Sequence, residues 1–142
     1  MNSVVLDTNV LLDLFVFKDP SAVPLQLALR AGQIDAVASA ATLAEFIDVI
    51  SRPLFALTPH EQSAIALQWQ SSARMLADKT LPMAPWRCKD PDDQVFLNLA
   101  YAIKPATLFS KDLALLKLAS KAAKEHILIS ANYRHLSFLL LP

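Results

Sequence analysis

Val4-Val5-Leu6-Asp7-Thr8-Asn9-Val10-Leu11-Leu12 is the stretch that says most about the fold of this chain. It opens with three apolar residues, two of them β-branched, which predicts a buried strand. Asp7, Thr8 and Asn9 then offer side-chain oxygens to the free backbone N–H groups of a helix that starts there. Open α/β sheets place ligands at the carboxyl ends of such strands. Asp7 therefore has two interpretations, a helix cap or a cation ligand, and this stretch alone favours the cap.

The composition indicates one compact domain over residues 1–142. Of 142 residues, 54% are hydrophobic and 18% are charged, which is enough to bury a substantial core. Thirteen basic and thirteen acidic residues balance, so no overall positive field attracts nucleic acid. The single glycine, Gly32, excludes a glycine-rich phosphate loop. The single cysteine, Cys88, excludes an intrachain disulfide and a multi-cysteine zinc site.

The first residues do not have the pattern of a targeting segment. Asp7 and Asp13 interrupt the N-terminal apolar stretch, and no basic segment precedes it, so we expect no signal peptide. No apolar run is long enough to span a bilayer. The sequence thus predicts a cytoplasmic protein without a membrane segment.

Strand and helix patterns alternate along the chain. Strands are expected at residues 4–6, 34–38, 106–109 and 126–129. Helices are expected at residues 10–17, from Leu25 to a stop at Gly32, from Ser39 or Thr42 to just before Pro53, at 58–76, from Asp92 or Asp93 to 103, and at 112–124. Residues 82–91 are expected to be irregular, and residues 133–141 to form a last short helix or strand. This alternation predicts a three-layer α/β/α fold with a mainly parallel central sheet.

Four acidic residues lie where this framework brings distant parts of the chain together. Asp7 and Asp112 each follow a predicted strand, Asp93 begins a predicted helix, and Glu45 lies outside the apolar stripe of its helix. Because parallel strands end at the same edge of a sheet, Asp7 and Asp112 should meet there, with Asp93 facing them. Such carboxylates repel one another unless a cation such as Mg²⁺ or Mn²⁺ neutralises them. A site of this kind can activate water and stabilise charge on a phosphodiester.

Each of these acids also has a plainer interpretation. Asp93 and Asp112 can be ordinary N-caps, and Glu45 can be a solvated residue. Three neighbouring acids compete for the same roles: Asp48 with Glu45, and Asp90 and Asp92 with Asp93. The spacing alone leaves both the metal site and the caps open.

Four motifs in order resemble those of the PIN-domain family. They are Val5-Leu6-Asp7-Thr8-Asn9-Val10, Leu43-Ala44-Glu45-Phe46, Cys88-Lys89-Asp90-Pro91-Asp92-Asp93-Gln94 and Ser110-Lys111-Asp112. The likeness spans residues 3–129, and within the family the chain looks like the VapC-like toxins of bacterial toxin–antitoxin pairs. The resemblance implies catalytic and metal-binding roles for Asp7, Glu45, Asp93 and Asp112, with Thr8, Asn9 and Ser110 as supporting polar residues. The apolar residues Phe96 and Ala100 fit the family's spacing behind Asp93, which favours Asp93 over its two rivals.

The same resemblance implies a Mg²⁺- or Mn²⁺-dependent endoribonuclease with an RNA substrate, a small antitoxin as partner and a homodimeric state. One alternative is a catalytically weak PIN-like RNA-binding module, against which the intact acid set argues. Another is a flavodoxin- or receiver-like signalling domain, which also gathers acids at a strand end. The acids here are spread over four elements, and no receiver-type lysine follows a late strand.

Basic residues are concentrated in the C-terminal part of the chain. Residues 104–142 contain six basic and two acidic residues. Lys117, Lys121 and Lys124 are spaced to share one face of the predicted 112–124 helix, and Lys111 directly precedes Asp112. We predict that these lysines contact RNA phosphates beside the acidic site. The alternative is a solvated helix face.

Overall fold

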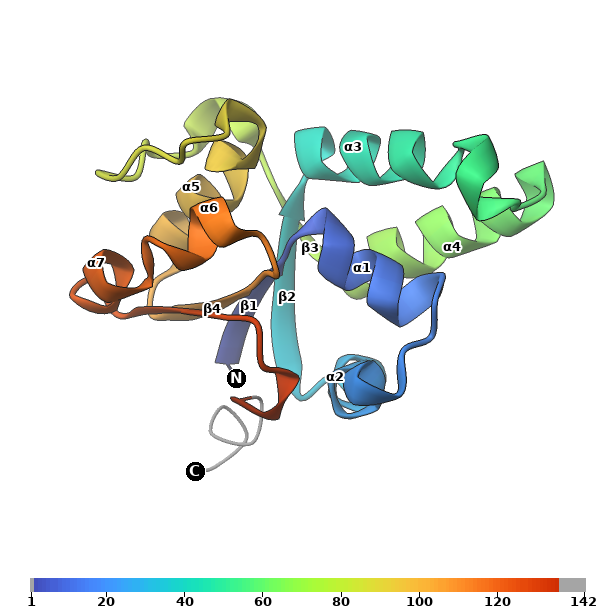
Figure 1. Ribbon diagram of the computed structural model, residues 1–142, viewed down its shortest axis with the longest axis horizontal. Helices are drawn as coiled ribbons and strands as arrows, with labels where there is room; N and C mark the ends of the chain where they lie inside the picture. The colour runs from blue at the N-terminus through green and yellow to red at the C-terminus, as the bar shows by residue number, and fades with distance from the viewer. Residues whose placement is uncertain (1, 136–142) are drawn as a thin grey trace.

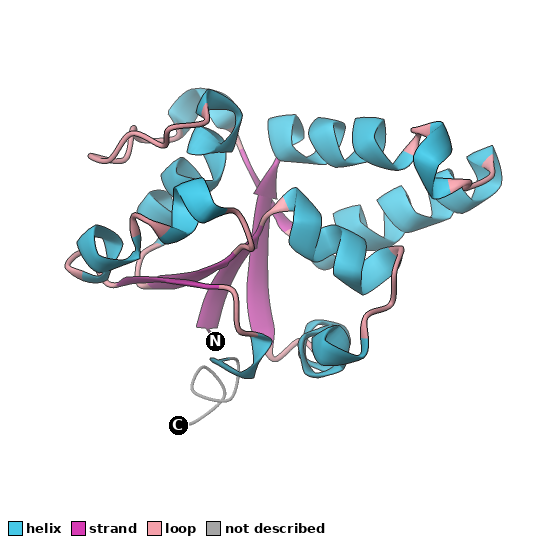
Figure 2. Ribbon diagram, viewed as in Figure 1, coloured by secondary structure: helices cyan, strands magenta, loops and turns pink. Residues whose placement is uncertain are grey.

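The computed structural model describes residues 2–135 and centres on a five-stranded, wholly parallel sheet with the strand order β3-β2-β1-β4-β5. The strands are β1 (Asn2–Leu6), β2 (Ile34–Ser39), β3 (Arg74–Leu76), β4 (Ala106–Phe109) and β5 (Ile127–Ser130). The helices are α1 (Thr8–Phe15), α2 (Val23–Arg30), α3 (Ala40–Ile50), α4 (Pro59–Ser72), α5 (Gln94–Ile103), α6 (Leu113–Leu116) and α7 (Ala119–Ala123). Helices cover both sides of the sheet (Figures 1 and 2), which confirms the predicted three-layer α/β/α fold.

The two faces of the sheet support two separate hydrophobic cores. Val4 and Leu6 of β1 belong to the core beneath α1 to α4, whereas Val5 belongs to the core beneath α5 to α7. Trp69 of α4 is fully buried in the first core and Leu97 of α5 in the second. Because both faces are covered, the central strands are apolar at successive positions rather than at alternate ones.

The register of the central strands sets the place of the functional site. Leu6 of β1 lies opposite Phe109 of β4, and the backbone N–H of Asp7 donates to the Phe109 carbonyl at 3.2 Å. The residues that follow these two strands therefore leave the same edge of the sheet side by side. α3 begins at this edge as well, because it follows the parallel strand β2 (Figure 1).

The expected 58–76 helix is wrong in its last turn. α4 ends at Ser72, Ala73 has an extended backbone, and residues 74–76 pair in parallel with β2 as the edge strand β3. The guanidinium of Arg74 also donates to both carboxylate oxygens of Asp35 in β2, at 3.2 and 2.8 Å. Pairing with a strand far away in the sequence thus ends this helix, without a local stop signal.

The expected single helix at 112–124 is also wrong, because the chain bends at Lys117 and Leu118 and forms two short helices, α6 and α7. The bend lets both helices bury a side chain in the core beside β5, Leu115 from α6 and Ala122 from α7. Lys117, Lys121 and Lys124 are exposed, but they do not share one face of a continuous helix.

After β5, the described part of the expected last element is a 3₁₀ turn, Tyr133–His135. The rest of the expected element lies outside the described residues. Among residues 2–135, no helix is long and apolar enough to cross a membrane.

Candidate acidic active site

Asp7 is held in place by both of its carboxylate oxygens. Its Oδ1 accepts from the backbone N–H of Val10 at 3.1 Å, so Asp7 is the N-cap of α1. Its Oδ2 accepts from the hydroxyl of Ser110, which follows β4. Asp7 is only 3% exposed, and this burial raises the pKa of Asp7 although the hydrogen bonds oppose the shift. Asp7 is therefore a cap, and it is also a buried acid beside the second strand exit.

The turn after β4 carries the second acid, Asp112. The Ser110 hydroxyl oxygen accepts from the backbone N–H of Asp112 at 3.0 Å. Asp112 is itself an N-cap, because its Oδ1 accepts from the N–H of Ala114 at 2.7 Å. One serine thus connects Asp7 with the turn that carries Asp112.

Glu45 reaches the site from α3. That helix begins with a capping box formed by Ser39 and Thr42, so both expected cap residues take part. The Thr8 hydroxyl of α1 donates to Oε2 of Glu45 at 2.8 Å. The rival acid Asp48 is exposed and pairs with Arg52 at 3.2 Å. Thr8, a predicted supporting residue, therefore orients Glu45 toward the start of α1.

Asp93 comes from the segment before α5. Asp90 caps the short 3₁₀ turn Pro91–Asp93 by accepting from the N–H of Asp92 at 3.0 Å. Gln94 fastens the preceding irregular segment, accepting from the N–H of Cys88 at 2.7 Å. Asp93 precedes α5, but its side chain does not cap the helix. Its Oδ2 is buried and has no hydrogen-bond partner among the described residues.

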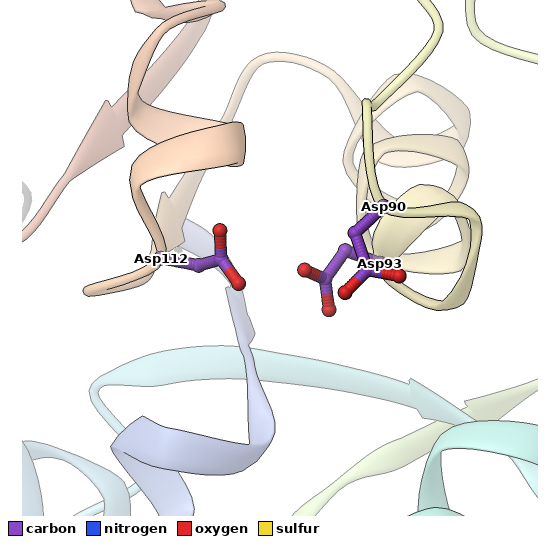
Figure 3. A group of neighbouring side chains, drawn as sticks. All are labelled: Asp90, Asp93 and Asp112. Atoms are coloured by element: carbon purple, nitrogen blue, oxygen red, sulfur yellow. The ribbon is translucent and has the colours of Figure 1, made fainter.

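The carboxylates of Asp90, Asp93 and Asp112 converge across a gap between two elements (Figure 3). Each offers one oxygen, and these oxygens lie within 4.8 Å of one another. Burial, followed by the neighbouring Asp112 carboxylate, raises the pKa of Asp93 to about 7. Three oxygens at this spacing suit a hard divalent cation, which would relieve the unfavourable charge of the cluster.

The four predicted acids line one cavity of about 290 Å³, although Asp7 and Glu45 are not part of the tight cluster of three. Asn9, the third polar residue of the first motif, also lines it. Arg52 is the one basic residue in this lining. The complete lining is Asp7, Thr8, Asn9, Leu12, Glu45, Val49, Arg52, Phe55, Asp93 and Asp112.

Asp90 belongs to this cluster, although the sequence indicated it only as a rival of Asp93. Residues three apart lie on the same side of a 3₁₀ turn, so Asp90 and Asp93 are neighbours in the cluster whereas Asp92 is not part of it. A proline directly after Asp90, followed by two further acids, is compatible with such a turn. The sequence alone therefore indicated a turn at Asp90, but it did not show that the carboxylates of Asp90 and Asp93 both lie close to Asp112.

Together, the parallel sheet and the acids at its carboxyl edge define an α/β protein with a site suited to a divalent cation. The chain belongs to the PIN domain family, whose pattern matches residues 3–114. All four predicted acids lie within the matched residues. No curated protein matches the chain. PIN domains are generally divalent-metal-dependent nucleases, so family membership supports a hydrolase that acts on nucleic acid.

Proposed function

We propose that this protein is a divalent-metal-dependent endoribonuclease and that residues 1–142 form a single PIN-like domain. One observation carries the proposal: carboxylates from four separate elements line one cavity, and the buried Oδ2 of Asp93 has no partner there among the described residues. A protein that only used these acids as helix caps would have no need to bury an unpaired carboxylate oxygen, because that costs stability.

The residues that would hold Mg²⁺ or Mn²⁺ are Asp7, Glu45, Asp93 and Asp112. A divalent cation in this place would supply Lewis-acid stabilisation of charge on the phosphodiester and would activate water. Oxygen-only donors of this type suit both ions. Asp90 belongs to the tight cluster of three, but it is exposed and does not line the cavity, so we assign it the role of adding negative charge beside Asp93.

The other polar residues fix the acids before any substrate arrives. Ser110 holds Asp7 and the turn of Asp112, and Thr8 holds Glu45. Preorganised groups of this kind lower the cost of reaching a reactive arrangement. The guanidinium of Arg52, at the cavity wall, would bind a phosphate oxygen of the nucleic acid.

The finer parts of the proposal rest on the ordered resemblance to VapC-like toxins. They are an RNA substrate, a role as the toxin of a toxin–antitoxin pair, a small antitoxin protein as partner, a homodimer and a cytoplasmic location. Lys117, Lys121 and Lys124 are exposed and free to contact phosphates of the RNA. The ammonium of Lys111, by contrast, forms an ion pair with Asp13.

The enzymatic part is tested with purified protein and two single strands of the same base sequence, one RNA and one DNA. We expect internal cleavage of the RNA with Mg²⁺ or Mn²⁺, loss of cleavage in excess chelator, and recovery when the metal is restored. An Asp7→Asn variant prepared in parallel excludes a contaminating nuclease, since it should not cleave. RNA binding without cleavage would favour the weak RNA-binding module, and equal cleavage of DNA would contradict the preference for RNA.

The toxin part is tested by controlled expression in bacteria. We expect growth to stop when the parent is induced and to continue when Asp7→Asn is induced at the same level. Co-expression of the product of a neighbouring small open reading frame should restore growth to cells that express the parent. Normal growth with the folded, active parent would contradict the toxin role while leaving the nuclease in place.

A further inference from the structure

A further carboxylate, that of Asp13 in α1, is buried outside the cavity that the four acids line. Asp13 is 5% exposed, and its Oδ2 accepts from the hydroxyl of Tyr133 at 2.8 Å. The same oxygen pairs with the ammonium of Lys111. A buried carboxylate is tolerated only when it is paired and hydrogen-bonded. The acid set proposed for catalysis does not account for this group.

Lys111 lies at the centre of the turn that carries Asp112. Of its two neighbours, Ser110 donates to Asp7 and accepts from the N–H of Asp112. The turn after β4 is therefore fastened to α1 at two points, through Ser110 to Asp7 at the start of the helix and through Lys111 to Asp13 near its end. Because the turn is attached to α1 both at Ser110 and at Lys111, it cannot rotate about either attachment alone.

Tyr133 brings the C-terminal part of the chain into this arrangement. Its segment follows β5 and turns toward α2 (Figure 1). Its ring packs edge-on against Phe109, the last residue of β4, at 5.8 Å, and the Lys111 ammonium lies 5.9 Å from the ring centroid. Burial, together with the Asp13 carboxylate, raises the pKa of Tyr133, so the hydroxyl keeps the proton that it donates. Tyr133 lies beyond the residues that match the family.

We propose that Asp13, Lys111 and Tyr133 form a clamp that positions Asp112 for metal binding. This inference rests on the proposed metal site. Lys111 and its two partners are positioning residues, because none of them lines the cavity. The clamp also assigns Lys111 a different role from the RNA contact expected from the sequence. Residues that orient a metal ligand from outside the first shell of ligands typically change metal affinity by about ten- to a hundredfold when they are altered.

The decisive variant is Lys111→Met, assayed for Mn²⁺ affinity with the full-length protein and no RNA. Loss of a cation near an acidic cluster should tighten Mn²⁺ binding if only charge matters. Loss of the clamp should weaken binding, by about tenfold. The two explanations therefore predict opposite signs. Lys111→Arg, which keeps the ion pair, should retain most of the parent's affinity, and Lys79→Met, which removes an exposed lysine elsewhere, should bind as the parent does.

The Mn²⁺ affinity of Tyr133→Phe gives a second test of the clamp that does not depend on a change at Lys111. It keeps the ring against Phe109 and removes only the hydroxyl, so it should fold and bind Mn²⁺ about threefold more weakly, a smaller effect than that of Lys111→Met. If Lys111→Met does not fold, this variant decides the question. Parent-like affinity in Tyr133→Phe would then overturn the clamp, and where Lys111→Met folds, parent-like or tighter binding in that variant would overturn it.

An RNA-binding measurement in chelator separates the clamp from a direct RNA contact. If Lys111 touched a phosphate, Lys111→Met would flatten the salt dependence of RNA binding and leave Mn²⁺ affinity unchanged, and this result would also overturn the clamp. We expect the reverse. If the parent binds no Mn²⁺, the proposed metal site is overturned and the clamp with it. If the parent binds Mn²⁺ and the variants bind it equally well, only the clamp is overturned and the proposed nuclease remains.

Discussion

The two turns that bring acids to the cavity are built in opposite ways. In the turn after β1, both oxygens of Asp7 have donors, the N–H of Val10 and the hydroxyl of Ser110. In the segment before α5, Oδ2 of Asp93 is buried and lacks a donor among the described residues. Burial raises the pKa of both acids, but hydrogen bonds oppose the shift at Asp7, whereas at Asp93 the nearby acids add to it.

Without a cation, only the Asp7 side of the site is therefore preorganised. The Asp7 side is held rigidly by its own hydrogen bonds, which favours accurate placement of a ligand. The Asp93 side retains an electrostatic cost that a bound cation would remove. We therefore expect substitutions on the Asp93 side to change catalysis and metal-free stability, and substitutions on the Asp7 side to change metal affinity.

The largest effect is expected at the unpaired acid. Asp93→Asn removes one charge from the cluster and one candidate ligand, and it should lower RNA cleavage by about a thousandfold or more. Asp90→Asn makes the same chemical change three residues earlier, at an exposed residue that caps a turn, and it should retain most of the activity. Single-turnover rates at saturating Mn²⁺ measure both. Equal losses would mean that Asp90 is as much a ligand as Asp93.

A smaller effect is expected on the Asp7 side of the site, where hydrogen bonds already hold the acid in place. Ser110→Ala removes the donor to Asp7 and the acceptor for the N–H of Asp112, so Mn²⁺ affinity should fall by about ten- to a hundredfold. Ser72→Ala, which removes a hydroxyl bonded to its own helix backbone in α4, is the matched control. Titration with Mn²⁺ compares them. Unchanged affinity in Ser110→Ala would show that Asp7 does not need its hydroxyl donor.

The third prediction concerns stability in the absence of metal. The pKa of Asp93 is raised from 3.8 to about 7, so between these values the folded protein binds more protons than the unfolded chain. Its contribution to the free energy of unfolding therefore falls as pH rises from about 4 to about 7 and stays low above that. Thermal melts in chelator should show this decline in the parent and a shallower one in Asp93→Asn.

At pH 8 the order of the two melting temperatures should then depend on the metal. In chelator Asp93→Asn should melt at a higher temperature than the parent, because it lacks the buried charge. In Mg²⁺ the parent should gain more, because binding to the native state alone stabilises it. If Asp93→Asn is less stable than the parent in chelator, then the charge of Asp93 does not destabilise the metal-free protein.

The smallest effect is expected outside both turns. Lys117→Ala combined with Lys121→Ala should weaken RNA binding at low salt and leave the saturated cleavage rate close to that of the parent. Each lost phosphate contact should flatten the plot of log affinity against log salt by roughly 0.7 for a single strand. Lys79→Ala serves as the control. Parallel lines for the double variant and the parent would show that these lysines only solvate the surface.

Local sequence determined much of this protein. The strand-to-helix junction at Asp7 follows from an apolar run beside three capping residues, and the start of α4 follows from Thr58, Pro59 and Glu61, which form the expected capping box. The order of parallel strands and helices places Asp7 and Asp112 at one edge of the sheet. These features depend on neighbouring residues and on rules of chain connection, which a sequence displays directly.

Tertiary structure decided the rest, because the causes lie far apart in the chain. β3 exists because residues 74–76 pair with β2, and the bend between α6 and α7 lets Leu115 and Ala122 reach one core. The desolvation of Asp93 and the contact of Asp13 with Tyr133 arise only when elements far apart in the chain have packed together. Burial and contacts between distant residues cannot be read from local patterns. The sequence therefore predicted four of the acids at this edge of the sheet, and the packing decided that Asp7 has hydrogen-bond donors whereas Oδ2 of Asp93 has none among the described residues.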